Sequence, residues 1–172
     1  LLENYLNLLK AQQLVEDLEK VNSSKDNLEL YVYKTLSDAF KNTSYMELVW
    51  QAEIQNPDNL DHALFEADVV LRIGYQLVCI SCTNINETDP QCQKALKERY
   101  NAKGYAIVLQ SKLLGGDEAK ALLVTTTTSY DVKILEKKLQ ADTGSTSEQV
   151  RVLGENDLSN LVDTVKGLLN IT

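Results

Sequence analysis

The most constraining feature of the sequence is a nearly continuous apolar run from Val69 to Ile80, which a turn at Gly74 interrupts. Such a run predicts two β-strands, about Ala63–Arg72 and Tyr75–Thr83, that are covered on both faces. A chain built around two buried neighbouring strands is expected to form an α/β domain with a central sheet.

The same two strands carry polar side chains at one place. Glu66 and Asp68 lie two residues apart on the first strand, so both side chains point to one face of the sheet. Ser81 and Thr83 share a face of the second strand, which is otherwise almost wholly apolar. Carboxylates and short polar groups that gather on adjacent strands indicate a functional site.

The composition fits one folded domain. A chain of 172 residues can bury a core without disulfides or metals, and 44% hydrophobic with 24% charged residues is typical of globular proteins. Three cysteines, an odd number, favour a reducing cytoplasm over a secreted disulfide framework. Neither an apolar run long enough to span a membrane nor a signal-peptide pattern is recognisable. We therefore expect a cytoplasmic protein that contacts no membrane.

The net charge of −8 excludes a uniformly basic nucleic-acid-binding protein, but the charge is uneven. Residues 1–70 contain 5 basic and 13 acidic side chains, whereas residues 91–120 contain six basic and three acidic ones. The basic residues expected to face phosphates are Lys94, Lys97, Arg99, Lys103 and Lys112. The alternative is an ordinary solvated helix face with mixed charges.

Hydrophobic periodicity predicts the remaining elements. Helices are expected at about Leu1–Val21, Lys25–Asn42, Gln91–Lys103, Asp131–Ala141 and Asn156–Leu169. Further strands are expected at about Tyr45–Ile54, Ala121–Thr127 and Gln149–Leu153, whereas Tyr105–Leu109 fits either a strand or a continued helix. The order α-α-β-β-β-α-β-α-β-α predicts a meander to which the later strands add in parallel, and hence a central mixed β-sheet flanked by helices.

Two further patterns concern the faces of the strands. Alternation along Tyr45–Ile54 predicts one apolar face made of Met46, Leu48, Trp50, Ala52 and Ile54. Cys79 and Cys82 have C-x-x-C spacing, but positions three apart on a strand face opposite sides. We therefore do not expect these cysteines to share a metal ion or to form a redox pair.

Four short motifs resemble, in this order, the restriction-endonuclease-like core of the PD-(D/E)xK nucleases. They are Leu28-Glu29 with Tyr31-Val32-Tyr33 and Leu36, then Glu66 with Asp68-Val69-Val70, then Leu77, Ile80, Cys82 and Thr83, and last Leu114-Gly115-Gly116 with Ala119 and Leu122-Leu123-Val124. In detail they resemble the nuclease domain of CRISPR-associated effectors that join an N-terminal CARF sensor domain to this fold. The resemblance spans about Asn27–Leu169 and favours a helix at Tyr105–Leu114.

The resemblance implies metal-dependent cleavage of phosphodiesters in DNA or RNA, with Mg²⁺ or Mn²⁺ as the cofactor if the domain is active. By position, the family's helix glutamate becomes Glu29 and its strand aspartate becomes Asp68. The family's Glu-Cys-Lys triplet becomes Ser81-Cys82-Thr83. Ser81 is a poor ligand for Mg²⁺ and Thr83 supplies no cation, so two of the four expected catalytic groups are missing.

Three functions are compatible with this pattern. The missing groups favour a degenerate nuclease domain, a pseudoenzyme retained for nucleic-acid binding or as a structural module. The second is an active nuclease with a rearranged metal site, in which Glu66 or Glu53 joins Glu29 and Asp68, although no basic residue near Thr83 in the sequence replaces the lysine. The third is a protein-interaction domain whose acidic N-terminal helices bind a partner.

The chain is expected to comprise an N-terminal helix or linker, residues 1–24, and a restriction-endonuclease-like domain, residues 25–172. Because it starts at Leu1 without Met and becomes helical at once, we expect it to be a fragment of a longer protein. The resemblance allows a sensor domain ahead of Leu1 and implies a homodimer.

Overall fold

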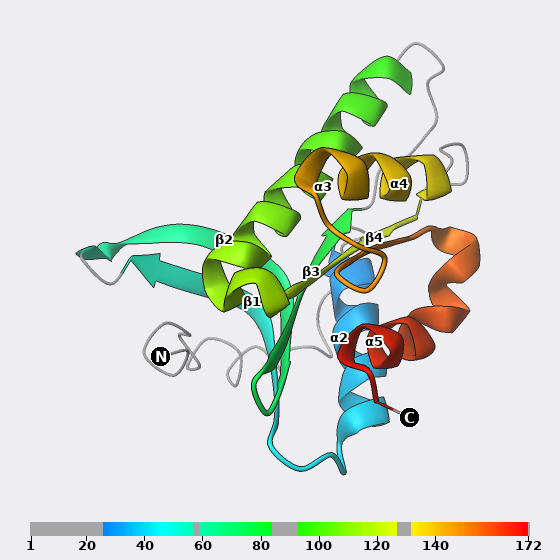
Figure 1. Cartoon of the computed structure of the whole chain (residues 1–172). Helices are drawn as coiled ribbons and strands as arrows, with labels where there is room; N and C mark the ends of the chain where they lie inside the picture. The colour runs from blue at the N-terminus through cyan, green and yellow to red at the C-terminus, as the bar shows by residue number, and fades with distance from the viewer. Residues whose placement is uncertain (1–25, 57–58, 84–92, 127–131, 172) are drawn as a thin grey trace.

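The computed structural model describes residues 26–56, 59–83, 93–126 and 132–171 (Figure 1). The predicted helix Leu1–Val21 and the segment 1–24 lie outside the described residues, and so does the side chain of Lys94. Within the described part, no helix is both long enough and apolar enough to cross a membrane.

The element order confirms the predicted α/β organisation. The helices are α2 (Asp26–Phe40), α3 (Gln93–Gly115), α4 (Val132–Thr143) and α5 (Leu161–Leu169). The strands are β1 (Met46–Asn56), β2 (Asn59–Ile73), β3 (Gln76–Thr83), β4 (Lys120–Thr125) and β5 (Val150–Leu153). Two short 3-10 helices, η4 (Gly116–Glu118) and η5 (Glu155–Asn160), precede β4 and α5, so the helix predicted at Asn156–Leu169 begins as a 3-10 segment.

The strands form one sheet in the order β1-β2-β3-β4-β5. The first three strands pair antiparallel, and β4 and β5 add in parallel, as predicted. Two hydrophobic clusters lie on opposite faces of this sheet. One packs β1–β5 against α3 and α4, and the other packs the sheet against α2 and α5 (Figure 1). The fold therefore has three layers, with the mixed sheet in the middle.

The β1 strand changes the face that it buries at Gln51. Gln51 has a φ of 51°, in the left-handed region that residues other than glycine rarely adopt. Trp50 packs in the cluster on the α2 and α5 side, whereas Ala52 and Ile54 pack in the cluster on the α3 and α4 side. The prediction of a single apolar face from Met46 to Ile54 is therefore wrong, because the left-handed residue interrupts the alternation.

The β2 strand leaves β3 at Asp68. The described ladder between them runs from Ile73 opposite Gln76 to Val69 opposite Ile80. Beyond it, β2 stays paired with β1 alone as far as the tip of their hairpin, which projects past the rest of the sheet (Figure 1). The separation of β2 from β3 leaves an opening beside the last residues of β3.

The α3 helix is one continuous element of 23 residues, so Tyr105–Leu109 is helical, as the resemblance implies. Ile107 and Val108 lie in the cluster that packs on the sheet. At Gly104, a Cβ atom would lie 2.6 Å from Cδ1 of Leu139 on α4. The absence of a side chain at Gly104 therefore lets α3 and α4 approach closely, and this contact fixes how α3 is rotated about its axis.

We predict that Gly104→Ala destabilises the domain. The new methyl group must displace the buried Leu139 side chain. Overpacking of this kind lowers the free energy of unfolding by about 1–3 kcal/mol. The higher helix propensity of alanine raises it by roughly 1 kcal/mol. Gly167→Ala in α5 is the matched control, since no atom lies within 4 Å of a Cβ at Gly167, and it should stabilise the domain. Urea unfolding checks both; a Gly104→Ala variant as stable as Gly167→Ala would contradict the close contact.

Candidate functional site

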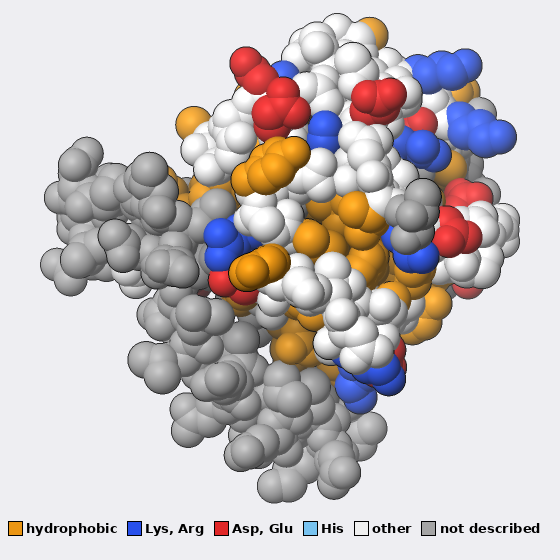
Figure 2. All heavy atoms as spheres, turned by 60° about the horizontal axis from the view of Figure 1, so that its bottom comes forward, with side chains coloured by type: hydrophobic (Ala, Val, Ile, Leu, Met, Phe, Trp, Pro, Cys, Tyr) orange, Lys and Arg blue, Asp and Glu red, His pale blue; other side chains and the backbone are white. Residues whose placement is uncertain are grey.

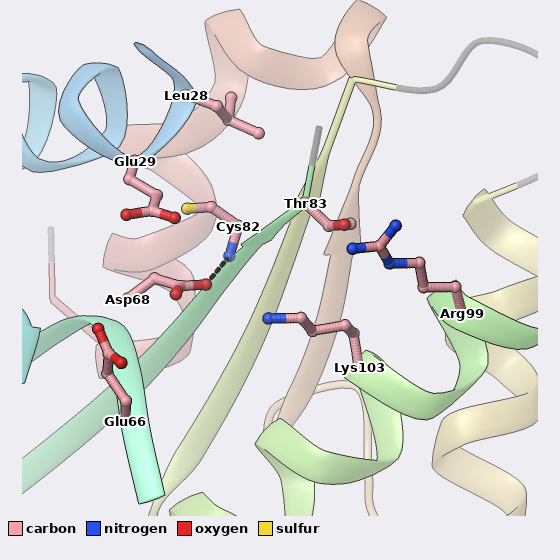
Figure 3. Close-up of a pocket in the computed structure, with 8 residues that line it drawn as sticks. All are labelled: Leu28, Glu29, Glu66, Asp68, Cys82, Thr83, Arg99 and Lys103. Atoms are coloured by element: carbon pink, nitrogen blue, oxygen red, sulfur yellow. Dashed lines mark hydrogen bonds between the residues drawn. The ribbon is translucent and has the colours of Figure 1, made fainter. Parts of the chain in front are cut away.

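A polar cavity of about 280 Å³ lies where β2 leaves β3 (Figure 3). Its lining residues come from four elements and are Leu28 and Glu29 of α2, Glu66 and Asp68 of β2, Cys82 and Thr83 of β3, and Arg99 and Lys103 of α3. The cavity therefore receives side chains from the sheet and from a helix on each of its faces.

The two helices present charged residues to the cavity for local reasons. Glu29 lies in the first turn of α2, where the partial positive charge of the helix N-terminus favours a carboxylate. Arg99 and Lys103 are four residues apart, so they project from the same side of α3. Figure 3 shows both basic side chains reaching from α3 across the cavity toward the strands.

The Asp68 carboxylate bridges the gap between the separating strands. Its Oδ2 accepts a hydrogen bond of 2.6 Å from the backbone N–H of Cys82 and one of 3.0 Å from the hydroxyl of Ser81. The pairing of β2 with β3 ends at Val69 and Ile80, so no backbone carbonyl of β2 is paired with the Cys82 N–H. The Asp68 carboxylate accepts that hydrogen bond instead. Asp68 therefore has a structural role in the walls of the cavity.

The cavity has an acidic side and a basic side. Figure 3 shows Glu29, Glu66 and Asp68 on the side of α2 and β2, and Arg99 and Lys103 on the side of α3. Glu66 and both basic residues are exposed, whereas Glu29 and Asp68 are half-buried. An anionic ligand would therefore be held against α3 and kept away from the β2 wall.

The thiol of Cys82 lies among these charges. Burial raises its pKa well above the ordinary value, and the carboxylates of Asp68 and Glu29 raise it further, against an opposing effect of the Lys103 ammonium. Burial alone raises the pKa of Cys79 to about 12. Both thiols are therefore neutral near pH 7 and poor nucleophiles. They belong to the clusters on opposite faces of the sheet, which confirms the prediction that they do not face one another.

Most of the residues singled out from the sequence converge on this cavity. Glu29, Glu66, Asp68 and Thr83 line it, and Ser81 reaches it through its hydrogen bond to Asp68. The spacing of two residues on β2 correctly indicated that both of its acids face one place. Glu53, the alternative to Glu66, is its partner in the β1–β2 ladder and is not among the lining residues.

The predicted basic residues separate into two groups. Arg99 and Lys103 line the cavity, whereas Lys112 lies on the α4 side of α3 and donates a hydrogen bond of 2.9 Å to the Thr143 carbonyl. Lys97 is exposed and is not a lining residue. No basic residue lies close to Thr83 in the sequence. In the fold, however, Lys103 of α3 lines the same cavity as Thr83. The i, i+4 spacing of Arg99 and Lys103 predicts that both project from the same side of a helix. The spacing does not predict which part of the domain that side faces.

The carboxylates that line the cavity are not already gathered around one point as a set of metal ligands. Among the residues that the structure describes, no group of three or more His, Cys, Asp or Glu side chains is placed to hold a metal. Oδ2 of Asp68 already accepts two hydrogen bonds, and the neighbouring Ser81 is neutral. Mg²⁺ usually keeps several waters and is bound through only one or two carboxylates, and at Asp68 one of the two carboxylate oxygens is already engaged by β3.

We predict that Asp68→Ala destabilises the domain by about 2–3 kcal/mol, because it leaves the part-buried N–H of Cys82 without its acceptor and also removes the bond to Ser81. Ser81→Ala removes one bond and should cost only about 1 kcal/mol. Denaturant unfolding of the two variants measures the difference. Equal destabilisation would show that the bond to the Cys82 N–H is unimportant.

No protein family model and no curated protein matches the sequence. Similarity is found among solved structures. The crystal structure of protein VC1899 from Vibrio cholerae aligns with 80% of this chain at a TM-score of 0.53 and 18% identity. The chain spans only 32% of that longer protein.

A second solved structure is the small subunit (R.BspD6I2) of the heterodimeric restriction endonuclease R.BspD6I. It aligns with 92% of this chain, and the alignment spans 78% of that subunit, at a TM-score of 0.51 and 15% identity. At such low identity the likeness concerns the fold and not the activity. Together with the mixed sheet and its flanking helices, it shows that this chain has a restriction-endonuclease-like fold.

Proposed function

We propose that this domain binds the phosphodiester backbone of a nucleic acid in the cavity and does not cleave it. The observation that carries the proposal is the pair of basic residues, Arg99 and Lys103, one helix turn apart and facing into the cavity. One structural neighbour is a subunit of a restriction endonuclease, which supports nucleic acid as the class of ligand.

The chemistry of the two side chains suits phosphate. The guanidinium of Arg99 can hold a phosphate through two parallel hydrogen bonds, and the ammonium of Lys103 adds a compact charge beside it. Residues four apart on a helix have Cβ atoms about 5–6 Å apart, so both cations can act on one short stretch of backbone. Both side chains are exposed, so a ligand reaches them without a change in the fold.

The acidic wall of the cavity favours binding along α3. Glu66 on the opposite wall is exposed and would repel a second phosphate backbone. On the face shown in Figure 2, Lys and Arg side chains are interspersed with Asp and Glu around a hydrophobic centre. With a net charge of −8, the domain is proposed to bind weakly and locally through α3, without a broad basic surface.

The domain is proposed not to cleave its ligand because Ser81 and Thr83 replace the glutamate and the lysine of the nuclease pattern. The Asp68 carboxylate holds the Ser81 hydroxyl and the Cys82 N–H, and Ser81 occupies the position where the nuclease pattern has a second carboxylate.

An active nuclease with a rearranged site is the second candidate function. One observation favours it: Lys103 lies in the same cavity as Glu29 and Asp68 and would supply the cation that Thr83 cannot. In that case Mg²⁺ or Mn²⁺ would be the cofactor, and the Ser81–Asp68 hydrogen bond would have to open to free the carboxylate.

We further propose, from the four sequence motifs alone, that the domain is related to the nuclease domain of CARF-containing effectors. In a protein of that kind, this domain would be the nuclease-like part of a cytoplasmic effector and would follow a sensor domain. Of the acidic N-terminal helices proposed as a protein-interaction surface, the first lies outside the described residues, and the second is α2, which packs on the sheet.

We predict that Arg99→Ala with Lys103→Ala weakens binding of a fluorescently labelled oligonucleotide. The logarithm of the binding constant falls linearly with the logarithm of the salt concentration, and each phosphate contact adds roughly 0.7 to this slope for single strands and roughly 0.9 for duplex DNA. Loss of two contacts should therefore reduce the slope by about 1.4 for single strands or about 1.8 for duplex DNA. Fluorescence anisotropy titrations over a range of salt concentrations measure this slope for both forms of nucleic acid.

Lys137→Ala is the matched control, since Lys137 is an exposed lysine on α4 and does not line the cavity. Its affinity and salt slope should equal those of the parent chain. An equal loss in the control and in the double variant would contradict a defined site. Failure of the parent to bind any nucleic acid at low salt would overturn the proposal.

We also predict that the parent chain, given Mg²⁺ or Mn²⁺, neither nicks plasmid DNA nor degrades RNA, because Ser81 and Thr83 stand where the nuclease pattern has a glutamate and a lysine. Gel assays compare it with Asp68→Asn and Lys103→Ala. Metal-dependent cleavage by the parent that both variants lose would replace the proposed function with the second candidate.

A further inference from the structure

The acidic wall of the cavity carries a carboxylate that the fold does not use. Glu66 lines the cavity and is exposed, and it makes no hydrogen bond or ion pair with any residue that the structure describes. Asp68, two residues further along β2, differs because β3 engages its Oδ2. Both carboxylate oxygens of Glu66 are therefore available to a ligand.

The place of Glu66 in the sheet argues against a role in stability. Glu66 lies directly opposite Glu53 in the antiparallel ladder of β1 and β2. Two like charges directly opposite one another on neighbouring strands destabilise a sheet. A glutamate that is unfavourable for the sheet and lines a cavity is better explained by contact with a ligand than by packing.

The acidic and basic sides of the cavity lie close to one another. Burial is the main cause of the raised pKa of the Cys82 thiol, and the carboxylates of Asp68 and Glu29 raise it further. The ammonium of Lys103 opposes this increase, so groups from both sides act on one thiol. Figure 3 shows Lys103 pointing toward the acidic side, with Arg99 beyond it. One small unit of a nucleic acid can therefore contact both sides.

The two sides of the cavity require different groups from a nucleic acid. The oxygens of a phosphate accept hydrogen bonds and suit Arg99 and Lys103. The Glu66 carboxylate is also only an acceptor, so the group that meets it must be uncharged and must donate a hydrogen bond. In RNA the ribose 2′-hydroxyl beside each phosphate is such a donor, whereas deoxyribose has no donor at that position.

We propose that Glu66 accepts a hydrogen bond from a ribose 2′-hydroxyl and thereby makes the cavity selective for RNA over DNA. The inference rests on the proposed function, because a phosphate must be held by Arg99 and Lys103 to bring its sugar to Glu66. The cavity of about 280 Å³ has room for a sugar together with its phosphate. Amino groups of bases also donate to carboxylates, but the sugar hydroxyl lies nearer to the phosphate and recurs at every nucleotide.

Oligonucleotides that differ only in the sugar test this assignment. We predict that the parent chain binds a single-stranded oligouridine about tenfold more tightly than the matching oligodeoxyuridine, as expected for one hydrogen bond to a charged group. An oligouridine with fluorine at the 2′ position keeps the ribose-like sugar pucker but lacks the donor, so it should bind like the deoxy form. Because the base is the same or nearly the same in all three, contacts to the base cancel. Fluorescence anisotropy at low salt measures the three affinities.

Glu66→Ala should abolish the difference between the RNA and DNA affinities, because it removes the acceptor. Glu66→Gln should retain part of the difference, since its amide oxygen still accepts a hydrogen bond. Glu53→Ala is the matched control, because Glu53 lies opposite Glu66 in the ladder and is not a lining residue. Both alanine variants lose a negative charge and should bind any phosphate backbone more tightly, so the readout is the ratio of the two affinities.

The double variant Arg99→Ala with Lys103→Ala separates this inference from the proposed function. If the parent binds RNA and DNA equally and the double variant binds both weakly, the preference for RNA is wrong and the phosphate site is right. A preference that survives Glu66→Ala, or that the fluorinated oligomer shares, would show that Glu66 does not read the hydroxyl. Failure of the parent to bind either oligomer would overturn both proposals. Circular dichroism spectra ensure that each variant retains the fold.

Discussion

The hydrogen bond from the Cys82 N–H to the Asp68 carboxylate is the interaction on which the cavity depends. β2 stops pairing with β3 at this point, and a part-buried N–H without an acceptor would cost about 1–3 kcal/mol. Because the carboxylate satisfies that donor, the β1–β2 hairpin can diverge from the sheet. The opening that results is reached by α2 from one layer and by α3 from the other.

The same interaction makes the Asp68 carboxylate a structural hydrogen-bond acceptor and leaves it less available as a metal ligand. An oxygen that holds a backbone N–H and the Ser81 hydroxyl stabilises the strand ends and is a weaker candidate for a metal ligand. The basic pair on α3 is independent of this arrangement, since its position follows from the packing of α3 on the sheet and on α4. The proposed affinity for anions therefore does not depend on a free Asp68 carboxylate.

The sequence predicted the fold more completely than the site. Apolar runs and helical periodicity predicted the five strands and the four α-helices, with the second half of α3 left open between strand and helix, and the spacing of Glu66 and Asp68 placed both acids on one face. The orientation of Arg99 and Lys103 could not be predicted, because the rotation of α3 depends on the Gly104–Leu139 contact between helices far apart in the chain. The left-handed Gln51 was missed for a similar reason, since glutamine carries no preference for that conformation.

The conformation of Gln51 has a consequence for how the domain behaves in a crowded solution. β1 is an edge strand, paired only with β2 among the described residues, and its outer backbone groups could recruit a strand from another molecule. A left-handed residue in the middle of that edge interrupts its regular alternation, and the acidic residues Glu47, which is paired with Arg72 of β2, and Glu53 lie on either side of it. An incoming strand would find no straight, uncharged edge on which to form a continuous ladder, so β1 is poorly suited to seed aggregation.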